Sequence, residues 1–152
     1  MHDAEGGNAA VIDLFKHMAT LGMYPGYYDC WQGLEPVSSY WHADWELQLK
    51  PNGNWCPTWV QCYIMKSWAF PELATTVFRP RAEKFGARAF YEDGFSNTGP
   101  EDHTDFDARY TNSGTMIDGI RGLATGWQRC RENAQGPVFS EGSGRSFYTA
   151  GL

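Results

Sequence analysis

Two short apolar runs of the chain each end in a carboxylate. Asp93 follows the run Ala87–Glu92, and Glu141 follows Pro137–Ser140. Between the two runs, Ser113–Asn133 has the composition and spacing of a helix. Parallel strands that are joined by a crossover helix bring their C-terminal ends to one edge of a sheet. The order of strand, acid, helix, strand, acid therefore predicts that Asp93 and Glu141 lie side by side over a common cleft.

Two neighbouring carboxyl groups are the catalytic groups that hydrolysis of a glycosidic bond usually requires. A retaining enzyme holds its two carboxyl groups about 5–5.5 Å apart, and an inverting enzyme separates them by about 6.5–9.5 Å to admit a water molecule. Adjacent strands lie about 4.8 Å apart, so that residues at their ends can reach either separation. The sequence leaves both mechanisms open.

Further polar and aromatic residues are candidates for binding a sugar near these acids. Asp29 ends the strand candidate Met23–Tyr28 and can bind a hydroxyl group on the same face, although an aspartate at a strand end also caps turns. Loop tryptophans stack on sugars, but they also fill protein cores. The predicted substrate-binding residues are Tyr28, Asp29, Trp31, Trp45 and Asn97.

Metal and nucleotide chemistry have weaker support in the sequence. The acidic segment 101–107 is interpreted as a solvated loop, because it lacks the glycine and the spaced terminal glutamate of an EF-hand. A metal-dependent hydrolase would recruit Asp29, His42, Asp44 or His103, but no paired-histidine spacing is present. Neither a nucleophile-serine elbow nor a phosphate-binding glycine loop occurs. We expect no metal and no cofactor.

Composition limits the class of protein and its partners. The chain has 152 residues, 42% of them hydrophobic, which suits one packed domain. A formal charge of −6 with scattered basic residues argues against a nucleic-acid partner. No apolar run approaches the length of a membrane span, and the N-terminal residues do not resemble a signal peptide. The four cysteines are predicted to be free and mostly buried, with one disulfide as the alternative.

Helix and strand patterns alternate along the chain. A first helix is expected after Asn8 as N-cap, with Gly22 ending it, and a helix over Pro71–Phe85 is expected to break or kink at Pro80. Cys30–Pro57 is interpreted as a long excursion above the sheet. The four predicted strands are Met23–Tyr28, Val60–Lys66, Ala87–Glu92 and Pro137–Ser140, and the third helix is Ser113–Asn133.

This alternation predicts an α/β fold with parallel strands between helices. A closed eightfold barrel takes about 250 residues, so we expect residues 1–152 to form a single partial (β/α) barrel domain of the TIM type. An open sheet of four strands is the rival. If the chain is a piece of a barrel, exposed sheet edges and apolar faces should make it poorly soluble or oligomeric.

Two of the runs resemble those of a known group of enzymes. The segments Ala89–Gly94 and Gly136–Gly142 are similar to consecutive strand ends of bacterial glycoside-hydrolase barrels that are related to the endo-α-N-acetylgalactosaminidases. The helix and strand that end at Asp29 resemble an earlier unit of such a barrel. The resemblance implies that Asp93 is the nucleophile and that Glu141 is the acid/base. It also implies a secreted or cell-surface protein.

The sequence is thus interpreted as part of a glycoside hydrolase that acts on a carbohydrate, with the retaining mechanism favoured. Glu141 needs a raised pKa in order to act as an acid, and Phe139 and Phe147 can provide apolar surroundings for it. Two alternatives remain: a non-catalytic carbohydrate-binding or structural fragment, and a metal-dependent hydrolase. A fragment need not be active by itself. The sugar, its linkage and the oligomeric state are not specified by the sequence.

Overall fold

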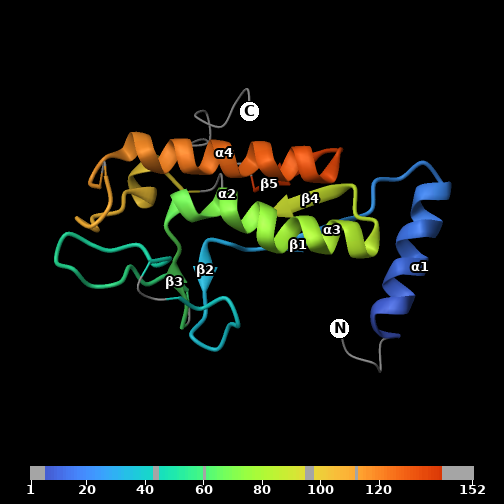
Figure 1. Ribbon diagram of the computed structural model, residues 1–152, viewed down its shortest axis with the longest axis horizontal. Helices are drawn as coiled ribbons and strands as arrows, with labels where there is room; N and C mark the ends of the chain where they lie inside the picture. Colours follow the sequence, from blue (N-terminus) through green and yellow to red (C-terminus); the bar gives the residue numbers. More distant parts are fainter. Residues whose placement is uncertain (1–5, 43–44, 60, 95–97, 112, 142–152) are drawn as a thin grey trace.

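The computed structural model describes residues 6–42, 45–59, 61–94, 98–111 and 113–141. They form a mixed α/β structure in which a parallel sheet lies beside a layer of helices (Figure 1). The sheet has three strands in the order β1 (Gly26–Asp29), β4 (Ala89–Glu92) and β5 (Val138–Ser140). The predicted α/β class and the parallel pairing of these strands are confirmed.

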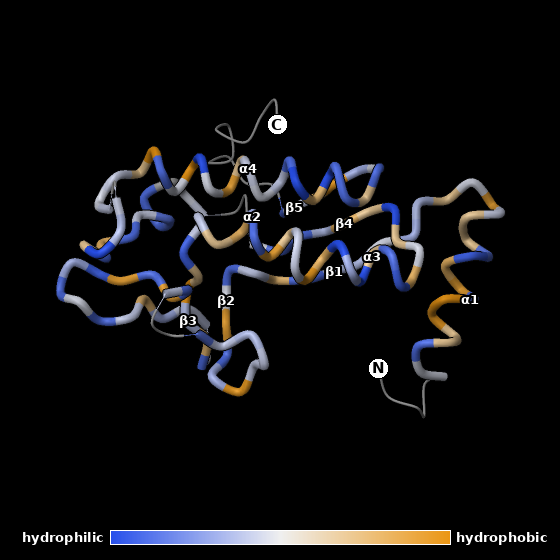
Figure 2. Tube along the Cα trace, viewed as in Figure 1, coloured by the Kyte–Doolittle hydropathy of each residue, from blue (hydrophilic) through white to orange (hydrophobic). Residues whose placement is uncertain are grey.

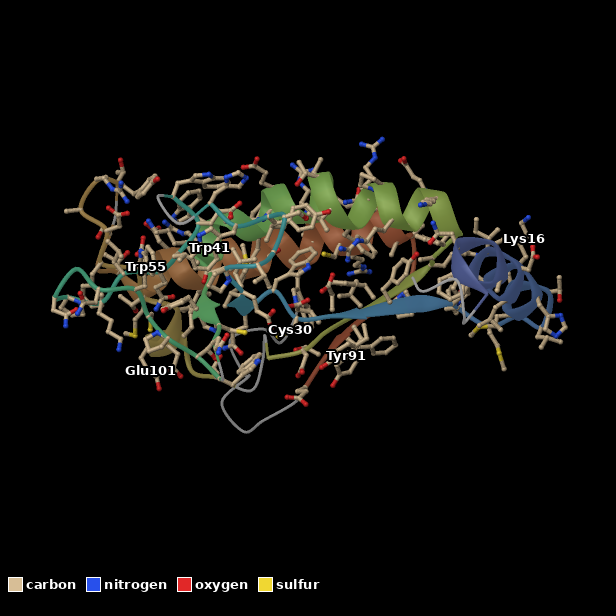
Figure 3. The ribbon with its side chains drawn as sticks, turned by 90° about the horizontal axis from the view of Figure 1, so that it is seen from below. Lys16, Cys30, Trp41, Trp55, Tyr91 and Glu101 are labelled. Carbon is tan, nitrogen blue, oxygen red and sulfur yellow. The ribbon has the colours of Figure 1, made fainter. Side chains whose placement is uncertain are left out.

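The register of the sheet decides which side chains share a face. Tyr28 pairs with Tyr91, and Tyr91 pairs with Phe139, so that three aromatic residues form a row across the sheet. Figure 3 shows that Tyr91 points away from the helices. Phe90, one residue earlier, points the other way and is buried against the helices. We call the row of Tyr28, Tyr91 and Phe139 the aromatic face.

The first helix, α1, spans Gly7–Thr20 and begins after Gly6, two residues before the predicted start. Figure 2 shows hydrophobic residues recurring along it. Phe15 is its buried anchor and contacts the ring of Tyr27 in β1, with 5.6 Å between the ring centroids. Gly22 follows the helix with a φ of 76°, a left-handed conformation that glycine adopts without strain.

The predicted helix over residues 71–85 is continuous, and it does not break at Pro80. It consists of α2 (Phe70–Leu73), a π-helical turn η3 (Ala74–Phe78) and α3 (Arg79–Phe85). In an α-helix a proline ring collides with the carbonyl group four residues earlier. The wider π turn just before Arg79 and Pro80 relieves this collision, so that the proline widens the helix instead of ending it.

The last helix, α4 (Met116–Ala134), packs closely on α2 and on the short 3₁₀ helix just before α2. Its buried side carries Gly119, Gly122 and Gly126. A Cβ atom at Gly122 would lie 2.5 Å from the backbone of Ser67, which begins the short 3₁₀ helix η2 (Ser67–Ala69). The small residues therefore let two backbones approach one another.

The prediction of a fourth parallel strand over Val60–Lys66 is wrong. Only Tyr63–Ile64 (β3) forms a strand, and it pairs antiparallel with β2 (Gly33–Leu34) in a separate two-stranded sheet. Neighbouring bridges join Met65 to Leu47 and Tyr63 to Pro57. This segment pairs with the chain shortly before it, because no crossover helix precedes it to carry it into the parallel sheet.

The core lies between the sheet and the helices. Phe78 of η3 and Phe90 of β4 are in ring contact, with centroids 4.4 Å apart, and Leu123 of α4 is buried in the same cluster. All four cysteines are free, as predicted: Cys62 and Cys130 are buried, and Cys30 and Cys56 are partly buried. Among the described residues, no helix combines the length and apolarity that crossing a membrane requires.

Candidate functional site

Asp93 and Glu141 follow neighbouring strands at the same level of the sheet. Glu92 pairs with Ser140, and the two acids come directly after these paired residues. The ladder extends past the strand end, because the Asp93 N–H donates to the Asp29 carbonyl oxygen at 2.9 Å. Adjacent strands lie about 4.8 Å apart. The C-terminal edge of the sheet thus carries an aspartate and a glutamate at adjacent positions.

Both acids act on the phenol groups of the aromatic face. The Tyr28 hydroxyl donates a hydrogen bond to Asp93 Oδ2. This bond, with smaller contributions from burial and from the negative charges of Asp93, Cys30 and Glu141, raises the pKa of Tyr28 to about 12. Burial raises the pKa of Tyr91, and the charges of Glu141 and Asp93 add to this effect. Asp93 and Glu141 are therefore within electrostatic range of the same two tyrosines.

The two tyrosines form a platform beside the acids. Their rings are stacked, with centroids 5.6 Å apart and planes inclined by 18°. Tyr28 is 67% exposed and Phe139 is 51% exposed, so the aromatic face is open in this chain. A shallow groove of about 360 Å³ runs along it. Phe139 does not enclose Glu141 in a buried environment, because both residues are exposed, and Phe147 lies outside the described residues.

Asp29 does not share the face of Asp93, contrary to the prediction. It pairs in register with Glu92, and its Oδ2 accepts a hydrogen bond of 2.7 Å from Arg81 of α3. The reason is the alternation of side chains along β1: Tyr28 points to the aromatic face, so Asp29 points to the helices. There Asp29 and Arg81 line a cavity of about 510 Å³.

The predicted tryptophan platforms are mainly packing residues. Trp31 is only 5% exposed and contacts Phe70 and Phe90 in the core. Trp45 is partly buried and stacks on Trp68, with 5.5 Å between the ring centroids. Trp41 and Trp55, labelled in Figure 3, meet edge to face. The last candidate, Asn97, lies outside the described residues.

The acidic loop is not the solvated segment that the sequence predicted. It contains the 3₁₀ helix η4 (Pro100–His103), and both His103 and Asp107 are buried. The ammonium group of Lys66, which has no exposed surface, forms ion pairs with Asp107 and with Asp105, the latter at 3.5 Å. The lysine thus supplies the positive charge that these carboxylates need inside the protein.

The alternative of a metal-dependent hydrolase would recruit Asp29, His42, Asp44 or His103 as ligands. In the part of the chain that the structure describes, no group of three or more histidine, cysteine, aspartate or glutamate side chains could hold a metal ion. His103 is enclosed, and burial lowers its pKa to about 4. His42 is exposed, and Asp44 lies outside the described residues.

Glu92 is a feature that the sequence analysis missed. It is the last residue of β4 and is fully buried, and its Oε1 accepts a hydrogen bond from the backbone N–H of Trp31. Burial raises the pKa of Glu92 well above its ordinary value, the hydrogen bond from the Trp31 N–H opposes this shift in part, and the charges of Asp29 and Asp93 add to it. A charged residue within an otherwise apolar run was the available signal, because Glu is almost never fully buried without a specific partner.

Comparisons with known proteins place the fold. A scan of the sequence finds no matching protein family, and no curated protein matches it. Among solved structures, the chain is similar to a ligand-free α-N-acetylgalactosaminidase, NagBb, from Bifidobacterium bifidum, with a TM-score of 0.74 and 12% sequence identity. The match covers 95% of this chain and 23% of the other. The chain is therefore related in fold to about a quarter of a glycoside hydrolase.

Proposed function

We propose that this chain is part of a (β/α) barrel that carries the two carboxyl groups of a retaining glycoside hydrolase. The observation that carries the proposal is the pairing of β4 with β5, after which Asp93 and Glu141 stand at adjacent positions on one edge. Parallel barrels bind substrate at this C-terminal edge. The fold similarity to NagBb supports a carbohydrate substrate, and the α-N-acetylgalactosaminidase activity for which that enzyme is named suggests an α-linked N-acetylgalactosamine.

The open aromatic face supports the barrel part of the proposal. The described helices cover one side of the sheet, and the row of Tyr28, Tyr91 and Phe139 occupies the other. In a closed barrel the side away from the helices is the interior, which bulky side chains fill. An interior row of this kind, exposed in a three-stranded piece, is what a barrel segment would present.

The two acids have different roles in this mechanism. Asp93 attacks the anomeric carbon, and Glu141 first protonates the leaving oxygen and then deprotonates the water that releases the sugar. The Tyr28 hydroxyl donates to one oxygen of Asp93, Oδ2. This bond fixes the rotation of the carboxylate and leaves Oδ1 to form the bond to the sugar.

The test compares two substrates in the full-length protein. An α-N-acetylgalactosaminide with a p-nitrophenolate leaving group needs little help from an acid, whereas an alkyl glycoside depends on it. We expect Asp93→Asn to reduce turnover of both substrates by at least about 10²–10⁴-fold, and Glu141→Gln to impair the alkyl glycoside far more than the aryl glycoside. Asp13→Asn and Glu132→Gln change exposed helix carboxylates and serve as matched controls.

The stereochemistry of the product provides the second readout. A retaining mechanism releases the sugar first in its original α-configuration, which NMR observes before mutarotation. Full activity of Asp93→Asn would refute the assignment. Binding of the sugar by a protein that lacks turnover, and that still binds after both substitutions, would identify a carbohydrate-binding domain instead.

A further inference from the structure

The end of β4 is joined to the end of β1 by three bonds. The Asp93 N–H donates to the Asp29 carbonyl oxygen, and the Trp31 N–H donates to the carboxyl group of Glu92. On the opposite face of the sheet, the Tyr28 hydroxyl donates to Asp93. The bonds of the Asp93 and Trp31 N–H groups therefore hold together the two strand ends that carry Tyr28 and Asp93, whose side chains form the third bond.

On the helix side, the side chain of Glu92 reaches across from β4 to the chain that follows β1. It pairs with Asp29 in the ladder, yet its carboxyl group extends past Asp29 to the backbone of Trp31. Trp31 is itself anchored in the core against Phe90. The bond therefore connects the first turn after β1 to β4, one residue before Asp93.

We propose that Glu92 is a positioning residue for Asp93: its bond to the Trp31 N–H aligns the ends of β1 and β4 so that Tyr28 can hold the Asp93 carboxylate. The catalytic consequence of this alignment rests on the function proposed above. The effect of Glu92 on the contact between Tyr28 and Asp93 is independent of that function, and it can be measured separately.

The surroundings of Glu92 favour its neutral form. Its Oε2 atom is buried and has no hydrogen-bond partner among the described residues. The charges of Asp29 and Asp93 act on it, and both Cys30 and Cys130 of α4 lie within electrostatic range. Arg81 is engaged by Asp29. A neutral carboxyl group still offers a carbonyl oxygen to Trp31, and so would the amide of glutamine.

This equivalence provides a matched pair of variants. Glu92→Gln keeps an acceptor for the Trp31 N–H, whereas Glu92→Leu has a similar size and removes the acceptor. The probe is the titration of Tyr28, followed by NMR of ¹³Cζ-tyrosine in the full chain and assigned with Tyr28→Phe. Asp93→Asn should lower the pKa of Tyr28 from about 12 toward its ordinary value near 10, which would establish that the probe reports the contact.

We expect Glu92→Gln to leave the pKa of Tyr28 near 12 and Glu92→Leu to shift it toward 10. A folded Glu92→Leu protein with an unchanged Tyr28 titration would overturn the proposal. If Glu92→Leu does not fold, Glu92→Asp withdraws the carboxyl group by one methylene and should give the same shift. A rapidly exchanging Trp31 amide in the unmodified protein would also overturn the proposal.

Glycosidase kinetics separate the failure of this inference from the failure of the proposed function. In an active protein, Glu92→Leu should reduce kcat at least about tenfold with little change in KM, because Asp93 is misplaced for attack rather than lost. Glu92→Gln should keep kcat close to that of the unmodified protein. If Asp93→Asn keeps full activity while the Tyr28 titration still responds to Glu92, the catalytic assignment fails and the positioning role stands.

Discussion

Lys66 shows how one buried residue can fix a loop that was predicted from the sequence to be exposed to solvent. Its ammonium group is buried, and it lies 4.2 Å from the centroid of the Tyr110 ring as well as against Asp105 and Asp107. Hydrogen bonds from Arg109 and Lys66 hold the pKa of Asp107 well below its ordinary value. Asp107 is therefore charged inside the protein and depends on these two cations.

Removing the lysine should destabilise the protein because it leaves Asp107 with its exposed partner, Arg109, and takes the ion pair with Lys66 away from Asp105. We expect Lys66→Met to lower the free energy of unfolding by roughly 3 kcal/mol, the lower end for a broken buried ion pair. The double variant Lys66→Met/Asp107→Asn should recover part of this loss, since it removes the charge of Asp107, the more deeply buried of the two carboxylates that pair with Lys66. Urea titration measures both effects. A single variant that is as stable as the parent would contradict the ion-pair account.

His103 predicts a specific dependence of stability on pH. It is 1% exposed, and burial lowers its pKa to about 4, against about 6.5 in an unfolded chain. Between these values the unfolded chain binds the extra proton, so stability rises with pH from about 4 to 6.5. Across this range the free energy of unfolding should rise by roughly 3 kcal/mol, because each pKa unit of difference between the folded and unfolded chain corresponds to about 1.36 kcal/mol.

His103→Gln keeps a polar atom near Thr98, whose hydroxyl lies 2.8 Å from His103 Nε2, but it does not titrate. The parent should therefore gain stability relative to this variant as the pH rises through the window. Urea titrations at a series of pH values measure the difference. Because the raised pKa of Glu92 acts equally in both proteins, it cancels. A constant difference between the two proteins would contradict the assignment.

Residue patterns predicted the positions of Asp93 and Glu141 better than those of the residues around them. An acid after a strand is visible in sequence, and parallel pairing brings strand ends to one edge. The side to which a residue points depends on the register within the strand, and a shift of one position exchanges the faces. For this reason Asp29 was assigned to the wrong face and the buried role of Glu92 was missed.

At the scale of elements, the contact between α4 and η2 depends on glycine. Alanine is favoured over glycine in an isolated helix by about 1 kcal/mol. At Gly122, however, a Cβ atom would meet the Ser67 backbone at 2.5 Å, and backbone cannot move aside as a flexible side chain can. The packing cost of such an insertion is typically about 1–3 kcal/mol.

We therefore expect Gly122→Ala to lower the free energy of unfolding, against the trend of helix propensity. Thr125→Ala is the matched control, since Thr125 is an exposed residue of the same helix, and it should gain up to about 0.5 kcal/mol. Thermal and urea unfolding measure both changes. Equal or greater stability of Gly122→Ala would show that α4 can shift without cost.

The elements were predicted well where the periodicity was long and poorly where it was short. The pattern over residues 113–133 lies within three residues of the bounds of α4. Val60–Lys66 is apolar for other reasons: Met65 is part of the hydrophobic core, and Lys66 is buried against Asp105 and Asp107. Composition alone does not distinguish a strand of the sheet from a buried connection, because both exclude water.

At the scale of the whole molecule, the parallel sheet has helices on one side and exposed aromatic residues on the other. A soluble monomer rarely leaves a contiguous apolar face uncovered, and the outer edges of β1 and β5 have no strand partner among the described residues. The sequence could indicate parallel strands from the alternation of elements. It could not indicate what covers the aromatic face, because the covering residues are not local to these strands.

This open face predicts that the 152-residue chain associates with itself when it is studied alone. Burying apolar surface releases about 25 cal/mol per Å², and Phe139 and Tyr28 are the most exposed members of the face. Sedimentation velocity over a series of concentrations should show species heavier than the 17.2 kDa chain. Phe139→Ser should shift the distribution toward the monomer, whereas Val37→Ser, at an exposed apolar residue away from the face, should not. A monomer at every concentration would show that the aromatic face is stable in water, and it would remove the support that this face gives to the proposal of a barrel.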